Sequence, residues 1–151
     1  MDEQPLPWAW VTEQLTGARS YWLATTRADG RPHAAPVWGV WLDDQLVFST
    51  GRSGVKGRNL ARSRDVAMHT DSADEVVICE GTLTEIASPD LPAAANAAYS
   101  AKYGADPALG PYRLDMFPPE EAAIWSLRPR VVLAWTEAEF EQTQSRWRFV
   151  R

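Results

Sequence analysis

Short strand-like segments at close spacing are the feature that most constrains how this chain can fold. The first, Ser20–Thr26, is rich in aromatic and β-branched residues, and a turn at Ala28–Arg31 follows it. Further predicted strands are Pro36–Leu42, Leu46–Thr50, Val66–Thr70, Glu75–Glu85 and Arg130–Trp135, with one more strand-like run at Ala123–Leu127. A series of short strands with few long helices predicts an antiparallel barrel.

Helical patterns are few and short. Apolar residues recur at helical spacing over Trp8–Leu15, a basic helix is expected after Gly54, and the alanine-rich segment Ala93–Tyr103 should end near Gly104. A proline-dense loop is expected over Asp106–Pro119. Because no repeat or shift in composition interrupts the chain, we expect one domain over residues 1–151.

Composition and charge exclude several classes of function. The formal net charge is -5, which argues against a general nucleic-acid-binding protein. No apolar run is long enough to span a bilayer, and the acidic, polar start does not resemble a secretory signal. The single cysteine, Cys79, lies in an apolar run and is expected to be a core thiol. These observations favour a cytoplasmic protein without a membrane or nucleic-acid partner.

The segment Ser49–Leu60 has the pattern of an anion site. It follows a predicted strand, passes through two glycines and leads into a helix. Five of the chain's 15 cations, and no acid, fall between Arg52 and Arg64. Free N–H groups at a helix start and nearby cations both favour phosphate. The alternative is an ordinary chain reversal followed by a solvated basic face.

Three residues of this segment carry the phosphate hypothesis. Lys56 is one of only two lysines and lies in the first turn of the expected helix, where a cation is unfavourable unless an anion is bound. Its alternative role is a solvated surface lysine. Ser53 has a second role open as a helix N-cap, and Asn59 as a surface helix residue.

Other residue types give weaker indications. His33 and His69 lack partners at the spacing of a metal site, so no metal is expected. His33 is expected to be exposed, and His69 to be a strand residue that faces a loop or pocket. Trp38 and Trp41 should point to opposite faces of one strand, one toward a pocket and the other toward the core or an interface.

The order of several short stretches resembles a known family. They are Tyr21–Thr26, Asp29–His33, Pro36–Trp41, Phe48–Gly51, Lys56–Leu60, Val76–Ile78, Arg128–Arg130 and Arg146–Phe149. Together, and covering about Trp8 to Phe149, they resemble the flavin and deazaflavin oxidoreductases of the split β-barrel superfamily. This is the group related to pyridoxamine 5'-phosphate oxidase, and the chain is most similar to its family B.

The resemblance implies a mainly β fold: a six-stranded antiparallel split β-barrel of Greek-key type with a few short helices. It also implies a homodimer with two cofactor sites at the subunit interface. The cofactor-binding residues carried over to this chain are Pro36, Val37 and Trp38 along the tricyclic ring; Phe48, Ser49 and Thr50, the last two near the ribityl or phosphate group; Ser53, Lys56 and Asn59 at the phosphate; and Trp147 and Arg148 toward the partner's cofactor.

The function implied is a coenzyme F-420-dependent oxidoreductase that transfers a hydride from the reduced deazaflavin to a small organic substrate. The arginines near Lys56 would suit the coenzyme's polyanionic glutamate tail. Two alternatives stay open: an FMN-dependent oxidase or reductase on the same fold, and a non-catalytic barrel that binds a cofactor or haem. Pyridoxamine-phosphate oxidation itself is disfavoured, because a clear second phosphate site is lacking. The sequence identifies no catalytic residue, proton donor or physiological substrate.

Overall fold

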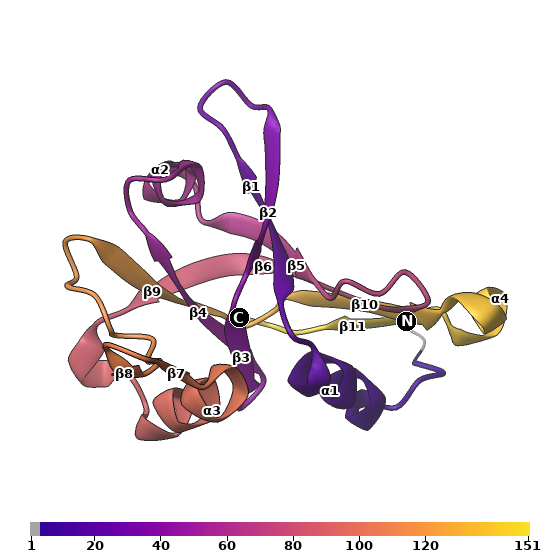
Figure 1. The fold of residues 1–151 in the computed structure, drawn as a ribbon. Helices are drawn as coiled ribbons and strands as arrows, with labels where there is room; N and C mark the ends of the chain where they lie inside the picture. Colours follow the sequence, from indigo (N-terminus) through magenta and orange to yellow (C-terminus); the bar gives the residue numbers. More distant parts are fainter. Residues whose placement is uncertain (1–3) are drawn as a thin grey trace.

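An antiparallel sheet of nine strands curls into a half-barrel in the computed structural model, which describes residues 4–151 (Figure 1). The strand order is β2-β1-β5-β6-β9-β4-β3, and β10 pairs with both β6 and β11. The strands are β1 (Tyr21–Thr26), β2 (Pro32–Val37), β3 (Gly39–Leu42), β4 (Gln45–Gly51), β5 (Asp65–His69), β6 (Glu75–Ile86), β9 (Ala122–Leu127), β10 (Val131–Thr136) and β11 (Ser145–Arg148). A separate short hairpin joins β7 (Ala105–Asp106) and β8 (Gly110–Pro111).

The predicted number of six strands is wrong. The expected strand Pro36–Leu42 is broken at Trp38, because β2 ends at Val37 and β3 begins at Gly39. In the sheet order these two strands stand at opposite ends. The C-terminal segment adds β11, which pairs with β10 through contacts that a local pattern does not reveal. The mainly β, antiparallel and barrel-like character of the prediction is confirmed.

The long strand β6 holds the curl together by changing partners. Its first half pairs with β5 and β10, and its last residues, Leu83–Ile86, pair with β9. Gly81 stands at the change, where an added Cβ would lie 2.9 Å from the side chain of Leu127. The absence of a side chain at residue 81 therefore permits the close approach of β9.

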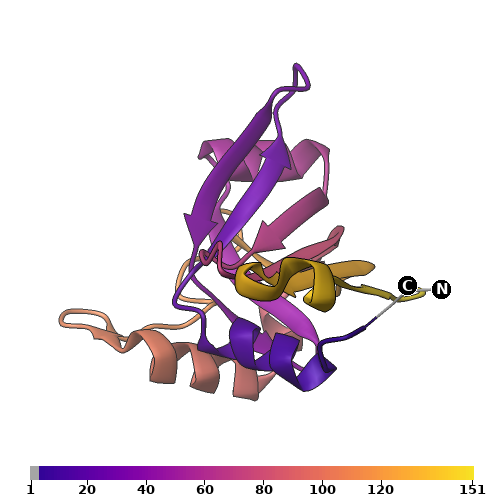
Figure 2. The same cartoon turned by 90° about the vertical axis from the view of Figure 1, so that its right-hand side faces the viewer.

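Helices cap the two ends of the curled sheet. They are α1 (Trp8–Gly17), α2 (Val55–Arg62), α3 (Ala93–Tyr103) and α4 (Phe140–Thr143), with short 3-10 turns η1 (Ser88–Asp90) and η2 (Glu137–Glu139). Figures 1 and 2 show α1 and α3 at one end and α2 at the other. The first three helices confirm the sequence prediction. Within residues 4–151, no helix has both the length and the hydrophobicity that crossing a membrane requires.

Tight turns follow the local sequence. Gly30 in the β1–β2 hairpin has a φ of 87°, as its place in the sequence predicted. Asp43 and Asp44 both have positive φ values, 52° and 56°, in the two-residue turn between β3 and β4. Positive φ at both central positions is the geometry that two-residue hairpins require.

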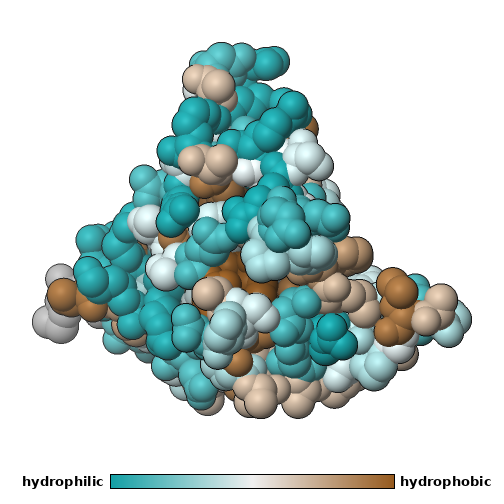
Figure 3. All heavy atoms as spheres, turned by 90° about the vertical axis from the view of Figure 1, so that its left-hand side faces the viewer, coloured by the Kyte–Doolittle hydropathy of each residue, from teal (hydrophilic) through white to brown (hydrophobic). Residues whose placement is uncertain are grey.

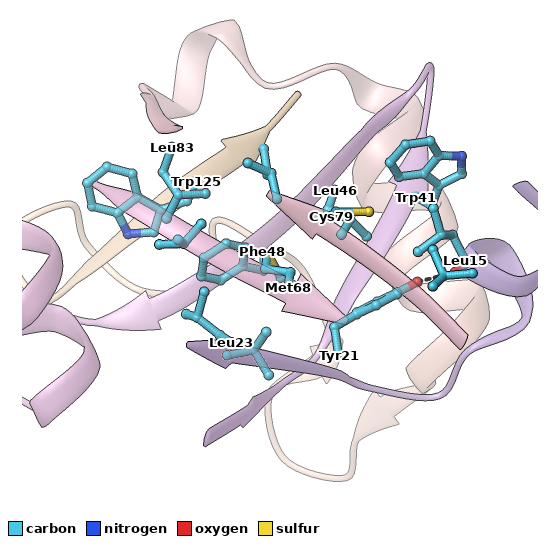
Figure 4. Packing of buried hydrophobic residues seen from close by; sticks show 14 of the residues in the cluster. Leu15, Tyr21, Leu23, Trp41, Leu46, Phe48, Met68, Cys79, Leu83 and Trp125 are labelled. Atoms are coloured by element: carbon cyan, nitrogen blue, oxygen red, sulfur yellow. Dashed lines mark hydrogen bonds between the residues drawn. The ribbon is translucent and has the colours of Figure 1, made fainter. Parts of the chain in front are cut away.

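The core has two parts. The larger fills the inside of the curl, where Figure 4 shows Leu23, Phe48 and Met68 in contact and the Tyr21 hydroxyl donating to the Leu15 carbonyl. Cys79 belongs to it, as predicted, and burial raises the pKa of its thiol to about 12. The smaller part joins β3, β4 and β9 to α3 and contains Val40, Val47, Ala95, Tyr99, Tyr103, Leu114 and Ile124.

The start of α2 packs directly on the backbone that follows β4. A Cβ at Gly57 would lie 2.1 Å from the Gly51 carbonyl oxygen and 2.6 Å from that of Arg52. No real side chain tolerates such distances, so this contact exists only because residue 57 is glycine. It fixes the turn that the sequence identified as an anion site.

Gly57→Ala should therefore lower the free energy of unfolding by about 1–3 kcal/mol, because the helix must move off the strand end. Gly54→Ala is a matched control, since its Cβ would meet no atom within 4 Å and its φ is already -73°. Denaturant unfolding of both variants measures the difference. Equal stability of the two variants would contradict the proposed role of Gly57.

Candidate functional site

A cavity of about 900 Å³ opens between the end of β4, α3 and the segment 106–122. Figure 3 views the side of the molecule that carries β8 and the end of β9, where hydrophobic residues form the floor of a recess framed by hydrophilic ones. The cavity is lined by Trp38, Ser49, Thr50, Gly51, Arg52, Ser53, Tyr99, Asp106, Leu109, Tyr112, Arg113, Met116, Phe117, Glu120, Glu121 and Ala122. Four of the predicted cofactor residues, Trp38, Ser49, Thr50 and Ser53, are thus brought together.

Two other predicted residues contribute their side chains to the core. Val37 is buried and the Phe48 side chain has no exposed surface. These positions can offer a ligand only their backbone. Pro36, by contrast, lies exposed on β2, one residue before the end of that strand.

Asn59 ties α2 to the sheet. It is buried, and its Nδ2 donates a hydrogen bond to the Thr25 hydroxyl at 2.9 Å. The alternative of a surface helix residue is therefore wrong. This bond and the Gly57 contact together hold α2 against the ends of β1 and β4.

The N-terminus of α2 has no side-chain cap. Gly54 is the N-cap residue, so the alternative of Ser53 as the N-cap is wrong. The first hydrogen bond within the helix runs from the Arg58 N–H to the Gly54 carbonyl. The N–H groups of Val55, Lys56 and Gly57 therefore make no hydrogen bond within the helix and can bind an anion.

Lys56 lies in this uncapped turn and is half-buried. Among residues 4–151 its side chain has no hydrogen-bond or ion-pair partner. A cation near a helix N-terminus is unfavourable without a negative group, and none is supplied by its own helix turn.

Most arginines of the basic segment have structural partners. Arg52 and Arg64 both pair with Glu85, and Arg64 also lies 4.9 Å from the centre of the Trp125 ring. Arg62 donates to the Thr26 carbonyl at 2.9 Å. The cation set predicted to bind an anionic tail is therefore reduced at this helix to Lys56 and Arg58.

Arg52 links the turn before α2 to the loop that borders the cavity. Its Nε donates to the Pro119 carbonyl at 2.6 Å, and its backbone N–H donates to the Glu121 carbonyl at 2.9 Å. Its guanidinium also pairs with Glu85 on β6. The anion-site turn and the cavity loop consequently share one anchoring residue.

Trp38 forms the corner between β2 and β3 and is held by aromatic residues that the sequence reasoning missed. Tyr103 stacks on it with ring centres 4.3 Å apart and planes 3° apart, while Tyr112 meets it edge-on at 5.4 Å. The Tyr103 hydroxyl accepts a hydrogen bond from the Gly39 N–H. The i, i+4 spacing of Tyr99 and Tyr103 on one helix face was the available signal.

The opposite roles expected for Trp38 and Trp41 are confirmed. Trp38 lines the cavity, whereas Trp41 is buried in the larger core. Trp22 lies on the exposed face of β1 and not in the core.

The two predicted tail residues have different surroundings. Trp147 packs on the core side of β11, with its ring centre 5.3 Å from that of Trp8. Arg148 is exposed, and its register partner is Val131 on β10. Neither residue lines the 900 Å³ cavity. Their contact with a partner's cofactor stays a prediction.

The histidines do not gather with other ligands. His33 is half-buried and its Nδ1 is buried without a partner, so its expected exposure is wrong. His69 faces a separate cavity of about 590 Å³ on the sheet surface. Within residues 4–151, no group of three or more His, Cys, Asp or Glu side chains could hold a metal ion.

Comparison with known proteins assigns the family. Residues 9–139 match the family model described as pyridoxamine 5'-phosphate oxidase, and the chain belongs to this family. No curated protein matches the sequence.

Solved structures share the fold. A haem-binding protein from Mycobacterium smegmatis superimposes with a TM-score of 0.68 at 20% identity, covering 95% of this chain and 58% of that chain. An F-420 reductase gives 0.61 at 23% identity, covering 80% and 93%. An FMN-binding protein from Nostoc punctiforme, related to pyridoxamine 5'-phosphate oxidase, gives 0.57 at 20% identity, covering 93% and 91%. At these identities the similarity shows the fold alone.

Lys102 on α3 lies behind the Trp38 corner. Its Nζ donates to the Gly39 carbonyl at 2.8 Å and to the Tyr21 hydroxyl at 3.1 Å. Burial, assisted by the like charge of Arg19, lowers the pKa of this ammonium group to about 8. The folded protein therefore releases this proton at a lower pH than the unfolded chain does.

Because the unfolded chain keeps the proton up to about pH 10.5, it binds more protons between pH 8 and 10.5, and stability rises with pH over this window. Lys102→Met removes this contribution. We expect the stability of the wild-type protein relative to the variant to increase from about pH 8 to about pH 10.5. Denaturant unfolding across this range measures it, and a difference that is independent of pH would contradict it.

Proposed function

We propose that the protein is a coenzyme F-420-dependent oxidoreductase of the split β-barrel group, acting on a small organic substrate. The observation that carries this proposal is the start of α2, which has no side-chain cap and bears Lys56, a lysine without a partner in the described part of the chain, next to the cavity-lining segment Ser49–Ser53. Three free N–H groups, a lysine ammonium and nearby hydroxyl groups form a donor set that suits a phosphate diester or monoester.

The residues present fit a flat cofactor joined to a phosphate. Lys56, Ser53 and the α2 N–H groups would hold the phosphate, with Ser49 and Thr50 along the connecting chain. The exposed Pro36 and the corner at Trp38 would border the ring system. When bound, the coenzyme would supply the hydride that reduces the substrate, and the protein would orient the two molecules and exclude water.

The homodimer of this proposal has a suitable surface on the outer face of the sheet. Cross-strand pairing places Pro36, Trp22, His69, Ile78 and Leu133 in one row over five strands, all of them exposed or half-exposed. Residues directly opposite each other point to the same face of a sheet. Their neighbours Leu23, Met68, Cys79 and Val132 point inward and are buried.

A row of this kind, with four apolar members and His69 in the middle, fits a second copy of the chain, because a two-fold interface pairs one surface with itself. The row ends at Pro36, two residues from Trp38. A partner on this face would therefore stand next to the proposed ring site, and Arg148, next to Val131 on β10, would reach toward it.

FMN is the second candidate cofactor, because one observation argues against recognition of the polyanionic tail of coenzyme F-420. Arg52, Arg62 and Arg64 are occupied by Glu85 and the Thr26 carbonyl, which leaves few cations at this helix for a polyanionic tail. The names of the structural neighbours cover F-420, FMN and haem. Haem is disfavoured, because none of the residues that line the 900 Å³ cavity is a histidine.

The direct test is binding of oxidised coenzyme F-420, FMN and haemin to the purified protein, compared with binding to Lys56→Ala. We expect F-420 to bind most tightly and the substitution to weaken it roughly 10- to 100-fold, because a charge-assisted hydrogen bond is lost. Arg128→Ala removes an exposed cation elsewhere and serves as the matched control. It should leave the dissociation constant unchanged.

Preferential FMN binding that is weakened by Lys56→Ala would retain the phosphate site and change the cofactor. Haemin binding that is insensitive to Lys56→Ala would overturn both the site and the function. Binding of none of the three would overturn the cofactor proposal.

The dimer proposal predicts that Ile78→Asp, which places a charge within the row between His69 and Leu133, yields a monomer in light-scattering measurements. Leu109→Asp adds the same charge at an exposed apolar residue outside the row and should keep the wild-type mass. A wild-type protein that is monomeric at micromolar concentrations would overturn the proposal.

A further inference from the structure

We infer that the cavity binds a planar, electron-poor aromatic substrate, which stacks on the indole of Trp38. This inference deepens the proposed function and depends on it for turnover, whereas the binding it describes is a property of the cavity itself. It assigns to the Trp38 side chain a role in substrate recognition that is separate from the backbone contacts of this corner.

The Trp38 ring is a rigid surface. Tyr103 covers one face in parallel, and Tyr112 and Tyr99 approach it at steep angles of 82° and 60°. Tyr103 is itself fixed, since its hydroxyl donates to the Arg19 carbonyl at 2.7 Å. The indole nevertheless keeps 38% of its surface exposed and lines the cavity. A ligand that stacks there loses little freedom of the protein side chain.

Large apolar side chains from the loop complete the cavity. Leu109 and Phe117 are 64% and 56% exposed, and Met116 lies beside them on the same lining. Exposed apolar surface concentrated at a cavity marks the place where an apolar ligand removes it from water. The aromatic and aliphatic side chains of the lining are Trp38, Tyr99, Leu109, Tyr112, Met116, Phe117 and Ala122, and together they offer a flat apolar ligand a large contact surface.

The loop that carries these side chains is anchored. Leu114 is buried and its N–H donates to Asn96 Oδ1 at 2.8 Å. The Asp115 carboxylate accepts from Asn96 and Ser88, and hydrogen bonds from these two groups and Arg113 lower its pKa against the opposing effect of burial. The cavity is therefore largely preformed at the base of the loop, with apolar side chains free at its rim.

The charge distribution over the face of the Trp38 ring determines which kind of ligand ring stacks on it best. The faces of Trp and Tyr rings carry negative quadrupole density, so parallel stacking on an indole favours a ring whose own face is positive. Two exposed carboxylates at the cavity, Glu120 and Glu121, have no ion-pair partner among residues 4–151, whereas the two arginines of the same lining, Arg52 and Arg113, are paired with Glu85 and Asp115. The unpaired carboxylates add negative potential. Both terms disfavour an electron-rich ring. The volume of about 900 Å³ lies at the upper end of the range for small-molecule sites, which leaves room for a ring beside a cofactor.

The test compares two probes of the same shape and opposite quadrupole, octafluoronaphthalene and naphthalene. Equilibrium dialysis with cofactor-free protein measures both dissociation constants. We expect the fluorinated probe to bind roughly 2- to 13-fold more tightly, the range that aromatic pair energies correspond to. Trp38→Leu should reduce this ratio to about one. Phe140→Leu removes an exposed aromatic ring outside the cavity and should leave the ratio unchanged.

Phe117→Ala provides a second variant in case Trp38→Leu does not fold, because Phe117 is an exposed wall residue. It should weaken both probes alike and keep their ratio. A wild-type ratio of one or below, or probe binding that neither substitution alters, would overturn the inference. Because no coenzyme is present, failure to bind F-420 would leave this result intact, and the two proposals are tested separately.

Discussion

The contact between Gly57 and the backbone after β4 is the constraint on which the candidate site depends. It sets α2 at van der Waals distance from the end of the strand, and no larger residue could occupy this position. The bond from Asn59 to Thr25 then fixes the helix against β1. Only with α2 in this place do its free N–H groups lie next to the residues that border the cavity. The proposed anion site therefore depends on packing as much as on charge.

Arg52 carries this constraint into the rest of the molecule. It belongs to the turn before α2, yet its hydrogen bonds reach the Pro119 carbonyl on the cavity loop and Glu85 on β6. A side chain with two fixed partners is poorly suited to bind a ligand anion as well. The charge that the sequence concentrates in this segment is thus divided between Arg52, which holds the loop, and Lys56 and Arg58, which are the cations proposed to bind an anion.

Local signals predicted the parts of the fold that local physics decides. The alanine-rich helix Ala93–Tyr103 and the turn at Ala28–Arg31 were predicted because helix propensity and turn geometry act over a few residues. The break at Trp38 was missed, because it depends on Tyr103, distant in sequence. For the same reason four of the predicted cofactor residues meet in the cavity, while Phe48 and Val37 prove to be core residues. A sequence pattern identifies the strand, but pairing decides which face each side chain takes.

The exposure of Trp38 follows from its place in the topology. The residue joins strands at opposite ends of the sheet, so the chain must turn there and the side chain cannot continue the alternation of either strand. Tyr103 stacks on one face and supports the ring, but no described element covers the cavity side, which leaves a large apolar ring partly in contact with water. Covering that surface by a flat ligand would recover hydrophobic free energy of about 25 cal/mol for each Å² removed from water. The corner that closes the sheet is therefore also the part of the cavity with most to gain from a stacked ring.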